Sequence, residues 1–473
     1  MATPGRLQWS SRFVFLMAAV GCAVGLGNIW RFPYTAGVNG GGAFVLVYLA
    51  AVALLALPVL MAELLIGRRG AAGPPAAIAA VAQESGRSPH WRWMGIILGG
   101  MGALLALSFY SVVGAWTIAY AFKMAAGQLQ QITADGAANT FDGLNANPRT
   151  LLLWFTVFIG ATIFISARGL HAGVERAVKF MMPALFVMLI MMVMYSAVVG
   201  DMGRALRFLF TPDFSKLNPT VIMGAFGQAF FSVSVGITNM MAYSAYIGRD
   251  TNLPRASLVI VGVDTLVALM AGLAIFPIVF MYGLDPGEGP GLVFMTLPFA
   301  FGQIPGGLIF GTLFFVLLFF AALTSSISML EPPVSWLRDA TSLSRRAAAT
   351  LMGGISFFLG TFAALSFNVL KDIHPLGSIR IFAGKTFFDL FDYLVTNIMM
   401  PIGGILIAVF AGWLMKSKFT HDELFAGRNA IVHRLWLVLV RFLAPAILGL
   451  VFIEMASGKS IFAMLAAIAG KLP

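Results

Sequence analysis

Residues 23–34 read Ala-Val-Gly-Leu-Gly-Asn-Ile-Trp-Arg-Phe-Pro-Tyr and lie within an apolar segment that runs from about Phe13 to Tyr48. Two glycines followed by an amide, a cation and a proline are a poor continuation of a helix. They suit a helix that opens at mid-membrane and directs free backbone groups at a ligand. We therefore expect the first helix to be broken, with a binding site at the break.

The composition is that of an integral membrane protein. Of the 473 residues, 59% are hydrophobic and 10% are charged, whereas soluble domains have roughly 45–50% apolar and about 25% charged residues. Strand-like alternation is absent, so we expect helices rather than barrel strands. The net charge of +11 comes from Lys and Arg scattered in short loops, which fits the positive-inside rule better than nucleic-acid binding. The only cysteine is Cys22, which excludes an intramolecular disulfide and a cysteine-built metal site.

Eleven apolar segments are long enough to cross a bilayer. Together they predict one polytopic membrane domain over residues 1–473, with no obligate protein partner evident. The distribution of Lys and Arg places the N-terminus in the cytoplasm, and eleven spans then place the C-terminus outside. The segments lie at about residues 13–37, 42–66, 94–125, 151–167, 177–200, 219–247, 257–283, 306–337, 348–370, 386–415 and 436–457.

Two connections between these segments are long. Residues 132–148 are acidic and rich in turn residues, which predicts a loop. Residues 285–307 are rich in Pro and Gly and predict a long loop with a short apolar hairpin, acting as a lid.

The sixth segment is interrupted as well, because serines and a glycine occur in its stretch GQAFFSVSVGITN at residues 227–239. Interruptions in segments one and six are expected of two five-helix inverted repeats. We expect these repeats over 13–200 and 219–415, followed by an extra eleventh helix at 436–457. Substrate and ion should then bind at the repeat interface near the middle of the membrane.

Four ionisable residues stand out within the apolar segments, where a charge at mid-membrane is costly and needs a partner or a water-filled cavity. Asp264 stands out because no basic residue is near it in the sequence. A hard cation such as sodium prefers carboxylate, carbonyl and hydroxyl oxygens, so Asp264 is a candidate sodium ligand. The alternatives are a carboxyl bonded to a neighbouring helix, or a position nearer the surface. The other three residues are Arg31, Glu63 and Asp392.

Residues 23–34, with Gly40-Gly41-Gly42-Ala43-Phe44 after them, resemble the neurotransmitter:sodium symporter family and in particular its bacterial amino-acid transporters. The resemblance covers nearly the whole chain and implies the leucine-transporter fold in a bacterial cytoplasmic membrane. It also implies two sodium sites. The first uses the Ala23 carbonyl with Asn28, Ser232 and Asp264, and the second uses the Gly21 and Val24 carbonyls with Ala321, Thr324 and Ser325.

This chain departs from many relatives at Asp264, where they have Asn, and a fixed negative charge there should tighten cation binding. The hydroxyl cluster at Thr324 and Ser325 has a plainer alternative, in which each hydroxyl bonds only to its own helix.

The resemblance also implies how a substrate is held. Its carboxylate meets the backbone N–H groups of Leu26 and Gly27, where a half-helix dipole favours an anion, and the Tyr110 hydroxyl bonds it. Relatives that carry monoamines have an aspartate at Gly25, whereas this chain leaves room for an α-amino acid. The implied side-chain pocket consists of Cys22, Ala106, Phe231, Ser234, Ile237, Ser328 and Met329, with Ala23, Ser232 and Ser325 shared with the sodium sites.

In this apolar set, Ala106, which is small, and Ile237 indicate room for a large hydrophobic side chain, although each residue alone also suits plain helix packing. The implied outer gate is Arg31 with Asp392, with Asp389 as a weaker partner. Glu63 is expected to support the open backbone of segment six. The implied inner gate is Arg6 with Asp339, near Trp9 and Tyr246; the plain alternative for either pair is a static surface ion pair.

The leading hypothesis is therefore a symporter that couples sodium entry to uptake of hydrophobic or aromatic L-amino acids by alternating access. The alternatives are an amino-acid-sensing receptor and a channel, but the chain has neither a soluble signalling domain nor a repeated pore loop. An enzyme is least favoured because no HExxH, GxSxG or Walker motif is present.

Overall fold

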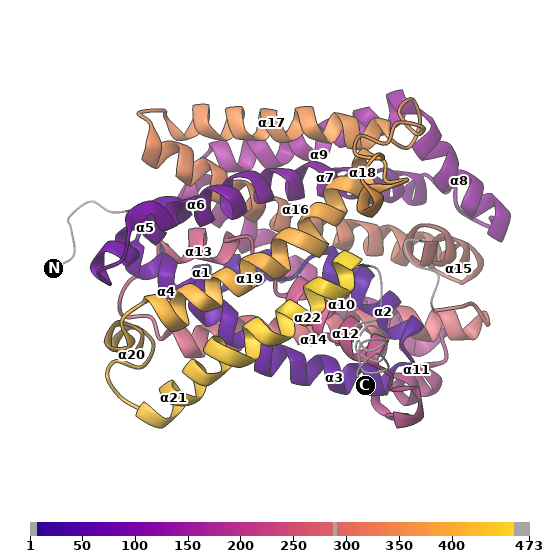
Figure 1. Ribbon diagram of the computed structural model, residues 1–473. Helices are drawn as coiled ribbons and strands as arrows, with labels where there is room; N and C mark the ends of the chain where they lie inside the picture. Colours follow the sequence, from indigo (N-terminus) through magenta and orange to yellow (C-terminus); the bar gives the residue numbers. More distant parts are fainter. Residues whose placement is uncertain (1–6, 287–290, 458–473) are drawn as a thin grey trace.

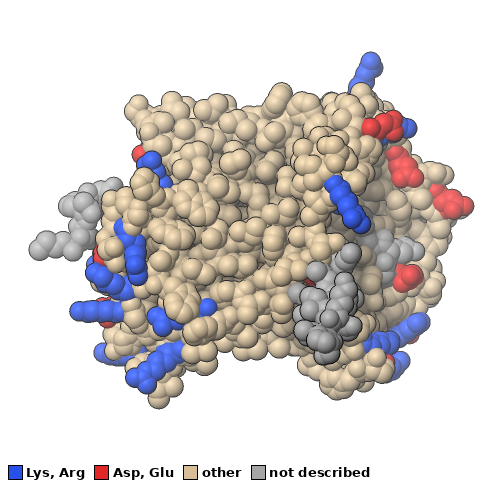
Figure 2. Space-filling view, viewed as in Figure 1, with Lys and Arg blue, Asp and Glu red and all other residues tan. Residues whose placement is uncertain are grey.

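The computed structural model describes residues 7–286 and 291–457, and Figure 1 shows that these residues form a bundle of long helices. No strand occurs in the described part of the chain. Within it, nine helices are long and apolar enough to cross a membrane, and a tenth span is a bent pair of helices. Figure 2 shows Lys, Arg, Asp and Glu gathered at the two ends of the bundle, with an uncharged belt between them. These features confirm an all-α integral membrane protein.

The first repeat expected from the sequence contains spans one to five. Several of these spans include a π-helical turn, which widens the helix locally. The elements are, for span one, α1 (Arg12–Ala23), η1 (Gly27–Arg31) and α2 (Phe32–Val38); for span two, α3 (Gly42–Ala51), η2 (Val52–Ala56) and α4 (Leu57–Gly70); for span three, η3 (Pro89–Trp91), α6 (Arg92–Gly95), η4 (Ile96–Gly102) and α7 (Ala103–Ala125); for span four, α9 (Pro148–Ala167); and for span five, η5 (Leu170–Glu175) and α10 (Arg176–Val199).

The second repeat and the extra helix follow, and span six brings the spans to eleven, because its two helices of 14 and 6 residues are each too short to be among the ten counted above. The elements are, for span six, α12 (Pro219–Ser232) and α13 (Asn239–Ser244); for span seven, α14 (Leu253–Met281); for span eight, α16 (Gly307–Ala340); for span nine, α17 (Arg345–Leu365); for span ten, α18 (Phe387–Tyr393), η9 (Leu394–Met399), α19 (Met400–Val409) and η10 (Phe410–Leu414); and for span eleven, α21 (Ala430–Val438), η11 (Leu439–Leu443) and α22 (Ala444–Ser457).

Shorter helices connect the spans at the two ends of the bundle. They are α5 (Pro74–Glu84), α8 (Ala134–Ala146), α11 (Met202–Phe210), η6 (Phe214–Lys216), η7 (Leu292–Thr296), α15 (Leu297–Gln303), η8 (Arg380–Phe382) and α20 (Ser417–Phe425).

Helix one is broken where the sequence predicts it. The chain leaves the helical conformation at Val24, and the two arms of the span meet at 50°. Helix six is interrupted over residues 233–238, where Ser234, Gly236 and Thr238 have positive φ angles of 56°, 100° and 61°. Such angles are costly for residues with a Cβ atom, so surrounding contacts must hold this backbone. One of them is the Glu63 carboxylate, which accepts a hydrogen bond from Gly236 N at 2.6 Å.

The expectation of a loop over residues 132–148 is wrong, because most of this stretch forms α8. Thr133 caps the helix by accepting a hydrogen bond from Gly136 N at 3.0 Å. Its apolar residues Ala137, Phe141 and Leu144 recur at helical spacing and are buried. Of the two acidic residues that indicated a loop, Asp135 lies in the first turn and Asp142 lies between the buried Phe141 and Leu144.

The expectation of a short apolar hairpin within residues 285–307 is also wrong. Residues 292–303 form one continuous helix, and Pro298 follows soon after its π-helical turn η7. The role of this segment as a lid stays a prediction, and residues 287–290 lie outside the described part of the chain.

Candidate functional site

Asn28, Ser232 and Asp264 form a buried polar cluster beside the break in helix one. The Asp264 carboxylate accepts hydrogen bonds from Asn28 Nδ2 and from Ser232 Oγ, each at 2.7 Å. Asn28 Nδ2 also lies 3.0 Å from Ser232 Oγ. Carboxylate and hydroxyl oxygens shielded from water are suitable sodium ligands. The cluster thus unites the three side chains that the sequence suggests for a first sodium site.

The orientation of the Asn28 amide determines how this cluster can hold a cation. Its Oδ1 accepts a hydrogen bond from Gly25 N at 3.0 Å, and its Nδ2 faces Asp264. An amide nitrogen is a donor, so a cation bound through Asn28 requires the amide to turn over and release Gly25 N–H. Ala23, whose carbonyl is the fourth suggested ligand, lines the same central cavity as Ser232. Cation binding here is therefore linked to the hydrogen bond that closes the break.

A second cluster lies where the end of α1 meets the middle of α16. Ser325 Oγ is 3.3 Å from both the Gly21 and the Val24 carbonyl oxygens. Thr324 Oγ1 is bonded to carbonyls of its own helix, at 3.0 Å to Phe320 and 3.1 Å to Ala321. The cluster contains the five oxygens suggested for a second sodium site. Thr324 fits the plainer alternative, in which a hydroxyl bonds to its own helix. Ser325 instead bridges the two helices.

A narrow central cavity lies between the two broken helices. Tyr110 OH accepts a hydrogen bond from Leu26 N at 3.3 Å, so tyrosine and free backbone donor meet as the sequence suggests. The cavity is lined by Ala23, Gly25, Leu26, Gly27, Ala106, Phe109, Tyr110, Phe231, Ser232, Ser234, Ile237, Ser325, Met329, Val395, Thr396 and Met400.

Two residues expected in this pocket do not line it. Cys22 is buried, and Ser328 Oγ donates to the Ser325 carbonyl at 2.6 Å. Sequence reasoning also missed residues that do line the cavity, from span ten: Val395, Thr396 and Met400. No local signal marks these three, because they are ordinary residues of an apolar helix.

Gly25 faces the cavity where no side chain fits. A Cβ atom there would lie 2.6 Å from Ser325 Oγ and 3.0 Å from Tyr110 OH. An aspartate at this position would therefore displace the two hydroxyls that border the break. This close approach explains physically why the position is glycine.

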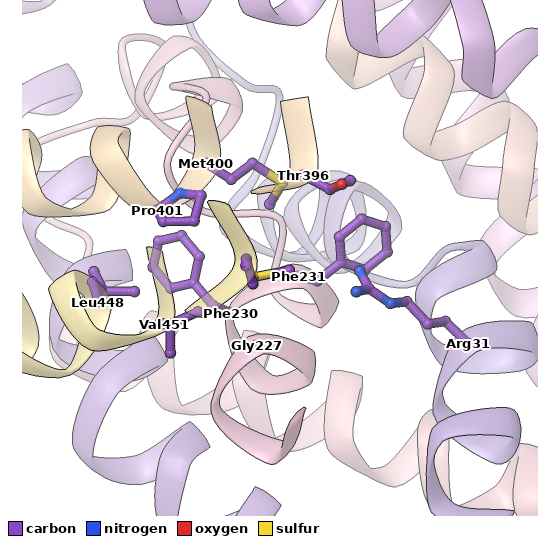
Figure 3. A pocket seen from close by; sticks show the side chains of 10 residues that line it. Arg31, Gly227, Phe230, Phe231, Thr396, Met400, Pro401, Leu448 and Val451 are labelled. Atoms are coloured by element: carbon purple, nitrogen blue, oxygen red, sulfur yellow. The ribbon is translucent and has the colours of Figure 1, made fainter. Parts of the chain in front are cut away.

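Phe231 separates the central cavity from a larger outer cavity. The free volume is about 30 Å³ in the central cavity and about 370 Å³ in the outer one, and Phe231 lines both. The Arg31 guanidinium lies 4.1 Å from the centre of the Phe231 ring, and Figure 3 shows the two side chains side by side. Phe231 is therefore the candidate barrier between the two cavities.

Arg31 and Asp392 both line the outer cavity, together with Asp389. Among the residues that the structure describes, no ion pair joins Arg31 to either carboxylate. The suggested outer pair is thus placed across one cavity without direct contact. The two sides must approach one another before this gate can close.

At the opposite end of the bundle, the Trp9 ring packs edge-on against the rings of Tyr243 and Tyr246. Trp9 Nε1 donates to the Tyr243 carbonyl at 2.9 Å, and Trp9 N donates to the Tyr246 carbonyl at 3.1 Å. Asp339, the suggested inner-gate carboxylate, accepts a hydrogen bond from Gly73 N at 2.6 Å. Arg6, its suggested partner, lies outside the described residues. The hydrogen bond from Arg12 lowers the pKa of Asp250 in the loop beside this aromatic packing.

The sequence reasoning missed a buried ion pair at this end. Glu331 accepts hydrogen bonds from Arg345 at 2.9 and 2.5 Å and from Tyr246 OH at 2.8 Å. The carboxylate is fully buried, so the pair ties span eight to span nine and to the chain just after α13. A glutamate before Pro332 inside an apolar segment is a signal that could have revealed it.

Comparison with known proteins agrees with this architecture. The model of the sodium:neurotransmitter symporter family matches residues 6–150 and 145–463. A sodium-dependent transporter of Bacillus subtilis, YhdH, is 39% identical over 95% of this chain and 97% of its own length. A sodium-dependent transporter of Haemophilus influenzae is 33% identical over 95% of this chain and 98% of its own.

Among solved structures, the crystal structure of MhsT in complex with L-phenylalanine is similar, with a TM-score of 0.85 and 40% identity. The match covers 95% of this chain and 100% of that one. Sequence and fold thus agree over nearly the whole chain, including both broken helices. The chain belongs to the sodium:neurotransmitter symporter family.

Proposed function

We propose that this transporter imports large hydrophobic or aromatic L-amino acids together with two sodium ions. The observation that carries the proposal is the hydrogen bond that Leu26 N–H donates to Tyr110 OH at the break in helix one. Both groups can donate a hydrogen bond to a carboxylate, and the break places the positive end of a half-helix beside them.

The lining of the central cavity supports the substrate class. Beyond Tyr110 the wall is mainly apolar, and the space at Gly25 is filled by hydroxyls rather than by a carboxylate that would hold an amine. Burial of a large apolar side chain against this wall supplies binding free energy in proportion to its area. MhsT, similar in fold, was crystallised with L-phenylalanine, which agrees with this substrate class.

Two sodium ions are proposed because two separate oxygen clusters flank the break. The Asp264 cluster lies against helices six and seven, and the Ser325 cluster lies against helix eight. Both contact the backbone near the break, so a cation at either cluster stabilises one arrangement of helix one. Amino acid and cations then favour the same conformation, which is the basis of coupled transport.

We propose that the protein resides in a bacterial cytoplasmic membrane with its N-terminus in the cytoplasm. The unpaired outer gate and the packed inner closure at Trp9 and Tyr246 suit a conformation that opens toward the outside. Alternating access would then close Arg31 onto Asp392 and release Trp9 from Tyr243.

The test is uptake of labelled amino acids by sealed vesicles that contain the purified protein. We expect accumulation of leucine, phenylalanine, tyrosine or tryptophan when a sodium gradient points inward, and none when potassium or choline replaces sodium. Binding without flux would favour an amino-acid sensor instead. Preference for glycine, GABA, dopamine or a charged amino acid would contradict the substrate class.

A further inference from the structure

Helix α11 lies at the end of the bundle opposite α5 and α20, and Figure 2 shows Lys and Arg side chains gathered over this corner. The helix presents three faces at helical spacing. They are the buried pair Ala205 and Leu209, the exposed apolar pair Leu206 and Phe210, and the exposed cationic pair Arg204 and Arg207.

Asp201, at the N-cap of α11, accepts a hydrogen bond from Arg204 N at 2.9 Å, but among the described residues its carboxylate forms no ion pair with the cationic face. Among the described residues neither Arg204 nor Arg207 forms an ion pair, and Arg204 instead covers the Phe280 ring at 4.6 Å. Lys216, in the following turn, is 3.9 Å from Asp213, and both of these side chains are at least half exposed. The segment lies on the side of the membrane opposite the N-terminus, which we expect to be the outside. The positive-inside rule predicts few cations there, yet residues 204–216 contain three. A cationic face beside an exposed apolar face is typical of a helix in the lipid interface.

This segment is packed tightly on the turn between α2 and α3. Gly41 and Gly42 approach it closely. A Cβ atom on Gly41 would lie 2.2 Å from the Phe208 carbonyl oxygen, and a Cβ atom on Gly42 would lie 2.6 Å from the Thr211 carbonyl oxygen. A Cβ atom on Gly40 would lie 2.6 Å from Lys216 Cδ. Because α2 continues directly into the turn that carries Arg31, the position of α11 constrains the outer arm of helix one.

The other side of α11 is anchored on span seven. Asp201 N donates to the Pro277 carbonyl at 2.9 Å, and the Phe208 ring packs edge-on against Phe276 and Phe280 at 5.0 and 5.3 Å. The segment therefore connects the outer end of α14 with the α2–α3 turn.

We propose that α11 and η6 bind an anionic phospholipid of the leaflet on this side, which holds the α2–α3 turn in place. The lipid phosphate pairs with Arg204, Arg207 and Lys216, and an acyl chain lies against Leu206 and Phe210. A lipid fits better than a soluble anion because the exposed apolar pair adjoins the cationic pair on one short helix. Each basic residue near an anionic membrane surface contributes measurably to binding.

The binding test uses the purified full-length protein in detergent and measures its melting temperature as dioleoyl-phosphatidylglycerol is added. We expect this lipid to raise the melting temperature more than dioleoyl-phosphatidylcholine does. In the Arg204→Gln/Arg207→Gln variant the concentration needed for half the effect should rise roughly 30-fold, at about tenfold per 1.4 kcal/mol. Both arginines are exposed, so the variant should keep the melting temperature of the unaltered protein without added lipid.

The matched control is Lys371→Gln/Arg380→Gln, which removes two exposed cations from the loop between spans nine and ten. It should respond to phosphatidylglycerol as the unaltered protein does. An equal response of the Arg204→Gln/Arg207→Gln variant would overturn the site. An equal rise with free glycerol phosphate would overturn the lipid as its ligand.

A transport measurement tests the coupling separately. Uptake of the unaltered protein should be faster in vesicles that contain phosphatidylglycerol, and this difference should disappear in the Arg204→Gln/Arg207→Gln variant. Lipid binding without any effect on uptake would contradict the link to helix one. The melting experiment does not depend on transport, so it stands even if the proposed substrate class fails.

Discussion

Tyr110 offers the sharpest test at the scale of a single residue. Tyr110→Phe keeps the ring but removes the hydroxyl that meets Leu26 N. A hydrogen bond to a charged group contributes about 1.5–3 kcal/mol, so amino-acid affinity should fall roughly 10- to 100-fold. Equilibrium binding of labelled substrate measures this loss.

The control for this substitution lies in the same helix. Tyr120 is buried and its hydroxyl has no hydrogen-bond partner in the described structure. Tyr120→Phe should therefore leave both affinity and melting temperature nearly unchanged. Substrate affinity of Tyr110→Phe within twofold of the unaltered protein would exclude Tyr110 from the binding site.

The negative charge of Asp264 leads us to predict that transport does not need chloride to balance the charge of the cations. Its carboxylate provides a negative charge within the first cluster. The residue one helical turn on, Ala268, is buried and uncharged, so it adds no further charge to balance the cation. A unit charge a few ångströms from a cation is worth several kcal/mol where the effective dielectric is low. Uptake should therefore continue when gluconate replaces chloride.

In Asp264→Asn, sodium and amino-acid affinity should fall together, because both depend on the same break. Sodium titrations with and without saturating substrate measure the two losses. A strong chloride requirement of the unaltered protein would show that the charge is supplied elsewhere.

At the scale of elements, the junction of α1 with α16 predicts the behaviour of the second cluster. Ser325→Ala removes the hydroxyl that bridges Gly21 and Val24. The apparent sodium affinity of uptake should fall several-fold, because a hard cation loses one oxygen ligand in a buried site.

Ser326→Ala is its matched control. Ser326 Oγ lies 2.8 Å from Thr162 Oγ1 of α9, so the same substitution one residue along changes the contact of α16 with α9 instead of its contact with α1. Its sodium dependence should match the unaltered protein. Equal losses in the two variants would indicate general damage to α16 rather than loss of a ligand.

The pair of Glu331 and Arg345 predicts how the inner closure is held. Glu331→Gln leaves the buried Arg345 without its countercharge, which commonly destabilises a protein by about 3–5 kcal/mol. The melting temperature should fall, whereas Glu84→Gln, in an exposed pair with Arg69, should change it little. A normal melting temperature for Glu331→Gln would mean that the pair does not hold this end of the bundle.

The broken helices were predictable from sequence because glycines, serines and an amide inside an apolar segment have few other uses. Helix α8 was not predictable in this way, because polar and acidic residues interrupt its short apolar stripe. The helix depends on packing against neighbouring helices. The role of Glu331 was missed because its partner, Arg345, lies beyond the end of α16, at the start of α17. The separation of Arg31 from Asp392 depends on the conformation of the whole protein, which no local pattern encodes.

At the scale of the whole molecule, two cavities in series imply ordered steps. If Phe231 is the barrier between these cavities, we expect a substrate to occupy the outer cavity first and to reach the central one when this ring moves. Phe231→Ala joins the two spaces and removes the ring beneath Arg31. Retention of bound amino acid should shorten markedly in this variant, as measured by release of label from loaded protein. Unchanged retention would show that another residue separates the cavities.

The ring at Phe231 also has a consequence for the time course of binding. If an amino acid can enter only while that ring is turned aside, the rate of the turn sets an upper limit on the rate of capture. The observed rate constant should then rise with amino-acid concentration and level off, instead of increasing linearly as in a simple diffusional encounter. The plateau is the frequency at which one side chain opens the way inward.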